Sequence, residues 1–110
     1  MTDRELLELA AKAAGYVLQE TEDGYECNFD DSRIWNPITD DGDALRLAVK
    51  LGETGFFRLN FGAGAVSAEN AAVKPLPILY ACEDMEELGG AAATRRAIVR
   101  AAAEIGRQMP

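Results

Sequence analysis

The sequence predicts an α+β fold, with helices packed on an antiparallel sheet of four to five strands. Apolar residues recur at helical spacing in three segments, and two other segments alternate apolar with polar residues around a glycine-containing turn. The resulting order of helix, two strands, helix, two or three strands and helix suggests an antiparallel sheet with helices packed on it, and it allows helices on both faces of the sheet. Because no repeat or linker divides the chain, we expect one domain over residues 1–110.

The first expected element is a helix with recognisable signals at both ends. Thr2 can cap its start while Glu5 reaches back to the Thr2 amide, and Gly15 is its natural stop. Residues 16–29 then predict a hairpin, because an Asp-Gly turn at 23–24 is followed by clean alternation of apolar and polar residues.

The next segment predicts a loop over 30–43, with a proline turn, followed by a helix near 42–51. This helix has an apolar face and two flanking apolar positions. They are Ala44, Leu47, Ala48 and Leu51, flanked by Leu45 and Val49. Its polar stripe is narrow and consists of Asp43, Arg46 and Lys50. We therefore expect the helix to be largely buried, with this stripe as its only outlet to solvent or a partner.

The second half predicts another hairpin over 55–69, in which glycines at 62 and 64 permit the turn. This Gly-x-Gly lacks the third glycine of a dinucleotide fingerprint. The segment after this hairpin contains Pro75 and Pro77, which predict a loop or a sheet edge for its first half. A further strand is possible near 78–82. Alanine, arginine and glutamate then predict a helix over 91–107.

The composition excludes several classes of function. There is no histidine, which removes Ser-His and Cys-His nucleophilic pairs and histidine-based zinc sites. The net charge of −8 argues against wrapping duplex nucleic acid. Cys27 and Cys82 lack metal-ligand spacing and are expected to be buried, reduced thiols. No apolar run approaches the roughly 20 residues of a membrane span, and the acidic start is unlike a secretory signal.

Charge is unevenly distributed along the chain. Residues 91–110 hold four arginines and one glutamate, a net of +3, so residues 1–90 carry −11. Arg96, Arg100 and Arg107 fall on one side of the last expected helix, and Arg95 lies between that side and the apolar face. Such a row could line an anion pocket, particularly one shared between subunits, or form a solvated face.

Two further features allow either a structural or a functional interpretation. Asp40, Asp41 and Asp43 stand at the start of a helix, where carboxylates cap amides and oppose the helix dipole, although a metal or sugar-hydroxyl site is the alternative. The spacing of a calcium-binding loop is absent. Trp35 can pack its ring on the core, which we favour, or stack on a nucleobase.

Three segments, "LLELAAKAAG", "WNPITDDGDALRLAVKL" and "AATRRAIVRAAAEIG", resemble the phage ABA-sandwich domain family of small proteins from tailed phages and prophages of proteobacteria. The resemblance covers both terminal helices and the middle helix with its preceding loop. It implies an α/β/α sandwich and a phage protein that acts in the cytoplasm of the host cell. It brings no established activity and no catalytic residues.

Our leading hypothesis is therefore a non-enzymatic counter-defence protein, in which a homo-oligomer sequesters an anionic nucleotide signal of host immunity. The arginines would contact phosphates, and an aromatic ring would stack on the base. The expected ligand-binding residues are Trp35, Arg46, Tyr80, Arg95, Arg96 and Arg100. Neither a cofactor nor a metal is needed. The hypothesis requires that the arginines are not consumed in internal ion pairs.

The alternative is an acidic protein–protein inhibitor, in which residues 1–90 imitate nucleic acid or block the basic cleft of a host defence nuclease. Its affinity should fall steeply with salt. A third class, a magnesium-dependent hydrolase built on the three aspartates, needs their side chains to converge on a cleft, whereas capping directs them at backbone amides.

Overall fold

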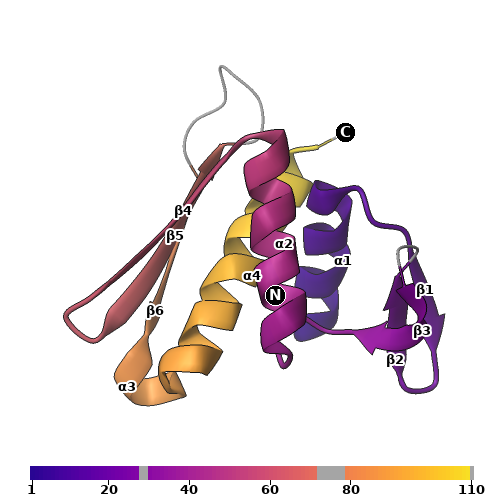
Figure 1. The fold of residues 1–110 in the computed structure, drawn as a ribbon, viewed down its shortest axis with the longest axis horizontal. Helices are drawn as coiled ribbons and strands as arrows, with labels where there is room; N and C mark the ends of the chain where they lie inside the picture. The colour runs from indigo at the N-terminus through magenta and orange to yellow at the C-terminus, as the bar shows by residue number, and fades with distance from the viewer. Residues whose placement is uncertain (28–29, 72–78, 110) are drawn as a thin grey trace.

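The computed structural model describes residues 1–27, 30–71 and 79–109. Within them a first helix is followed by three strands, a second helix by three more strands, and the chain ends with two helices (Figure 1). In chain order these are α1 (Asp3–Ala14), β1 (Leu18–Thr21), β2 (Gly24–Cys27), β3 (Asp30–Trp35), α2 (Asp41–Thr54), β4 (Phe56–Gly62), β5 (Ala65–Ala71), β6 (Leu79–Asp84), α3 (Met85–Leu88) and α4 (Gly90–Gln108).

The strands form two separate antiparallel sheets of three strands each, β1-β2-β3 and β4-β5-β6. Figure 1 shows α1, α2 and α4 as a layer between the two sheets. The α+β class is confirmed. The prediction of a single sheet of four to five strands is wrong, because the described strands form two sheets of three. The predicted α/β/α order of layers is also wrong, because the helices of the described residues cover only one face of each sheet. The helix layer lies between the two hairpins, so their strands cannot pair.

The first helix follows its sequence signals closely. The Thr2 hydroxyl accepts a hydrogen bond from the Glu5 amide at 3.2 Å, and Gly15 ends α1 in a left-handed conformation with φ of 78°. The Glu5 carboxylate accepts a hydrogen bond from the Thr2 hydroxyl at 3.1 Å, where the sequence predicted the Thr2 amide as the donor.

The first sheet contains the expected hairpin and an unexpected third strand. β1 and β2 pair around the predicted turn, with Thr21 opposite Gly24. β3 then pairs with β2, although its residues were expected to form a loop. The register shifts between Glu26 and Cys27, and this bulge lets the aspartate-rich β3 continue the sheet as far as Trp35. The hairpin's last two residues, 28 and 29, lie outside the described residues.

The second hairpin is confirmed: all seven residues of β4 pair with β5. Its turn residues Ala63 and Gly64 both have a positive φ, of 52° and 76°. Of the two glycines predicted to permit the turn, only Gly64 does so through a positive φ. β6 confirms the further strand, while Pro75 and Pro77 lie outside the described residues. Cys82 of β6 is exposed, which corrects the expectation of two buried thiols, whereas Cys27 is buried.

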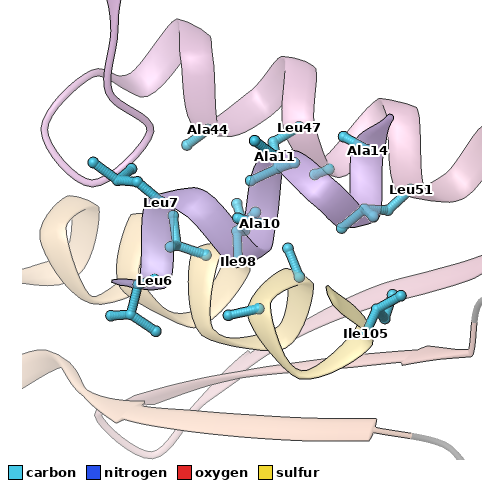
Figure 2. Close-up of a cluster of buried hydrophobic side chains, with 14 of the residues drawn as sticks. Leu6, Leu7, Ala10, Ala11, Ala14, Ala44, Leu47, Leu51, Ile98 and Ile105 are labelled. Atoms are coloured by element: carbon cyan, nitrogen blue, oxygen red, sulfur yellow. The ribbon is translucent and has the colours of Figure 1, made fainter. Parts of the chain in front are cut away.

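The core fills the space between the helices, and Figure 2 shows apolar side chains of α1, α2 and α4 gathered there. Many of these side chains are alanines, which lets the helix backbones approach closely. At Gly106 of α4 a Cβ atom would lie 2.1 Å from the Leu9 carbonyl oxygen of α1. Leu47 of α2 is fully buried at the centre of the same cluster.

Candidate functional site

The arginine row of α4 lies against β6 and the start of α1. Arg100 pairs with the Glu83 carboxylate and also donates to the Cys82 carbonyl oxygen at 3.2 Å. Arg96 donates to the Asp3 carboxylate at 3.4 Å, and its Nε lies 3.9 Å from Glu83. These guanidinium groups therefore join α4 to its neighbours through internal ion pairs.

The other two predicted arginines lie elsewhere and are also engaged. Arg95 donates to the Asp41 carboxylate at 2.6 Å and to the Ile38 carbonyl oxygen at 2.7 Å, which ties α4 to the start of α2. Arg46 donates to the buried Asp43 carboxylate at 2.8 Å. The structure therefore brings Arg96 and Arg100 together on Glu83 but does not gather all four arginines into one anion pocket.

The three aspartates near the start of α2 have three different structural roles. Asp40 caps the helix by accepting from the Asp43 amide at 2.8 Å, as expected. Asp43 accepts from the Asn36 amide at 2.9 Å, in addition to its pair with Arg46. Asp41 engages Arg95 across the helix layer. Among the residues that the structure describes, no group of three or more histidine, cysteine, aspartate or glutamate side chains is placed to hold a metal ion.

Neither predicted aromatic residue is shown in a stacking position. Trp35 is 2% exposed, and its ring meets Tyr16 edge-on with centroids 5.8 Å apart, so core packing is confirmed. Its ring nitrogen is buried without a hydrogen-bond acceptor. Tyr80 pairs with Glu69 in the β5–β6 ladder, and its side chain lies outside what is described.

An open apolar groove of about 350 Å³ lies between α2, β4, α3 and the first turns of α4. Its walls are mainly aliphatic and aromatic side chains. The principal ones are Leu45, Leu59, Phe61, Met85, Ala91 and Ile98. Asp41, Thr94 and Arg95 form the polar part of the lining. We call this feature the apolar groove.

Comparison with known protein families, characterised proteins and solved structures finds no match. None of the described helices is long and apolar enough to cross a membrane. The site must therefore be interpreted from its own geometry.

Two large side chains of the apolar groove are unusually exposed. Leu45 is 64% exposed and Phe61 is 61% exposed, and Val49 of the same helix is 53% exposed. The expectation that α2 meets solvent only through its polar stripe is therefore wrong. The face built on Leu47 packs into the core, and the flanking apolar residues point elsewhere. Leu45 and Val49 are spaced i, i+4, and this spacing was the sequence signal for a second apolar stripe on α2. The pattern alone cannot show which of the two stripes is buried.

The lining of the apolar groove includes one exposed carboxylate. The Asp41 side chain is 77% exposed, whereas that of its partner Arg95 is 20% exposed. The short helix α3 contributes Met85 to the groove, and the next two residues, Glu86 and Glu87, are exposed. The lining of the groove is therefore mainly apolar, and its one carboxylate, that of Asp41, is exposed to solvent.

Shifts in pKa occur in a different, surface cluster at the junction of α1 with the first sheet. Tyr25 donates to the Glu8 carboxylate at 2.6 Å, and Arg4 donates to the same group at 3.3 Å. The hydrogen bond from Tyr25, followed by that from Arg4, lowers the pKa of Glu8, and the same bond raises the pKa of Tyr25. This cluster connects two structural elements and does not line the apolar groove.

Proposed function

We propose that this chain is a non-enzymatic binding protein that captures another protein through the apolar groove. The observation that carries the proposal is the exposure of Leu45 and Phe61 beside an open groove of about 350 Å³. Withdrawal of apolar surface from water is the main driving force of protein association. Clustered apolar side chains on a surface, next to polar groups, are typical of interaction sites.

The acidic-inhibitor hypothesis fits this groove better than nucleotide capture does. An inhibitor of a basic protein needs apolar anchors to provide affinity and carboxylates around them to provide selectivity. Both are present, because Asp41 belongs to the lining and the exposed Glu86 and Glu87 directly follow the lining residue Met85 in the sequence. Counter-defence in the cytoplasm of a phage-infected cell completes the proposal, and that setting is supported by the sequence resemblance alone.

Nucleotide capture by a homo-oligomer has less support. Each arginine that should contact phosphate already engages a carboxylate, so an anionic ligand would have to displace Asp41, Asp43 or Glu83. One observation favours it. α4 begins beside the apolar groove without a side-chain cap and without an acidic residue in its first turn, and the amino end of a helix attracts anions.

Replacing Phe61 with serine should abolish most partner binding without unfolding the protein, since this side chain is 61% exposed. Tagged wild type and the Phe61→Ser variant would be used as baits in proteobacterial cell extract, and retained proteins would be quantified by mass spectrometry. We expect a protein held by wild type to fall about tenfold or more, as for the loss of one anchor residue.

Val17→Ser is the matched control, because Val17 is 68% exposed and does not line the groove. It makes the same kind of apolar-to-hydroxyl change on another surface and should leave capture unchanged. If Phe61→Ser retains the same proteins in the same amounts as wild type, capture through the groove is ruled out.

A further inference from the structure

We infer that the segment which enters the apolar groove is a positively charged amphipathic helix of the partner protein. The inference rests on the proposed function and adds the charge and shape of the bound segment. It is carried by the arrangement of charge and apolar surface around the groove.

The first observation is the unequal exposure of the ion pair at the edge of the groove. The carboxylate of Asp41 is mostly open to solvent, at 77% exposure, while the Arg95 side chain is 20% exposed and is also held by the Ile38 carbonyl. The positive member of the pair is therefore largely covered by protein. An approaching segment meets the carboxylate first, and a lysine or arginine beside Asp41 would gain a favourable contact.

The second observation is the charge of α3, on the other side of the groove. Met85 contributes its side chain to the lining, and Glu86 and Glu87 follow it as exposed residues. Among the described lining residues, Arg95 is the only one with a positive charge. The exposed carboxylate of Asp41 in the lining, and the two exposed glutamates that follow Met85 in the sequence, therefore favour a cationic partner over an anionic one.

The third observation is the shape of the walls. Two of them are the helices α2 and α4, and the exposed Leu45 and Phe61 come from two different elements, α2 and β4. A third helix can place a row of side chains between such walls, because residues at i, i+3 and i+4 project from one face. Lysine or arginine on the flanks of that helix would then lie over Asp41 and the α3 glutamates.

Three synthetic helical peptides of equal length test this inference on the full chain. Each carries leucine at helical spacing, and the remaining positions are lysine, glutamine or glutamate. Fluorescence anisotropy with labelled peptides should show the lysine peptide binding about tenfold or more tighter than the glutamine peptide, and the glutamate peptide weakest. Raising salt from about 50 to about 300 mM should weaken the lysine peptide most.

Matched variants separate the groove from the general acidity of the chain. Asp41→Asn should weaken the lysine peptide about threefold, as for one partly exposed charge pair. Glu53→Gln removes the same charge from an exposed position outside the groove and should change nothing. Phe61→Ser should weaken the lysine and glutamine peptides alike, because it removes an apolar anchor.

The outcomes distinguish this inference from the proposed function. If the glutamine peptide binds as tightly as the lysine peptide and both depend on Phe61, the groove is a binding site but the cationic partner is wrong. Equal effects of Asp41→Asn and Glu53→Gln would likewise overturn the charge argument. If binding of every peptide is independent of Phe61, both the inference and capture through the groove fail.

Discussion

Gly106→Ala is expected to lower the free energy of unfolding by about 3 kcal/mol, a large share of the roughly 5–15 kcal/mol that holds a domain folded. The added Cβ would lie 2.1 Å from the Leu9 carbonyl oxygen and 2.8 Å from its carbonyl carbon. These are backbone atoms of α1, so no side chain can rotate to relieve the clash. The helices must separate, which opens the alanine-rich contact between α1 and α4. Urea denaturation followed by circular dichroism measures the change.

Gly52→Ala is the matched control, since Gly52 lies within α2 and nothing stands within 4 Å of a Cβ placed there. The same substitution should stabilise the protein by about 0.5–1 kcal/mol, because alanine favours the helix more than glycine does. If Gly106→Ala were as harmless as Gly52→Ala, the close approach of α1 and α4 described above would be incorrect.

Leu47→Ala should lower the free energy of unfolding by about 3–4 kcal/mol, through lost burial and the cavity it leaves. Leu47 is fully buried in the cluster shared by α1, α2 and α4 (Figure 2). Thermal and urea denaturation of the variant would both report the loss.

Leu45→Ala, two residues earlier in the same helix, should change the free energy of unfolding by no more than about 0.5 kcal/mol, since its side chain is 64% exposed. The contrast has a functional meaning. A leucine that contributes little to folding but borders an open groove is available for a partner. A loss of stability at Leu45 similar to that at Leu47 would show that its side chain is part of the core, which would weaken the binding proposal.

Local signals in the sequence predicted the elements whose causes are local. The Thr2 cap, the Gly15 stop and the glycine turn of the second hairpin depend on neighbouring residues, and each is found in the structure. β3 was missed because its aspartates disfavour a strand in isolation. Its formation depends on pairing with β2 through a bulge, which no local pattern encodes.

The candidate site was harder to predict because it depends on contacts between distant residues. The row of arginines on α4 was visible, but its carboxylate partners were not, since Asp3 lies 93 positions from Arg96. Likewise, α2 has more apolar residues than one core stripe needs. Only the packing of α1 and α4 against Leu47 determines that Leu45 and Val49 remain outside.

The central claim is that binding occurs in the apolar groove and not at Arg46, Arg96 and Arg100. Native mass spectrometry tests it most directly, with the full chain incubated together with the leucine–lysine peptide and a mixture of cyclic and ADP-ribose-type nucleotides. The account predicts that wild type retains the peptide mass, that Phe61→Ser does not, and that neither retains a nucleotide. An oligomer that carries a nucleotide mass and no peptide would contradict it and restore the arginines as the site.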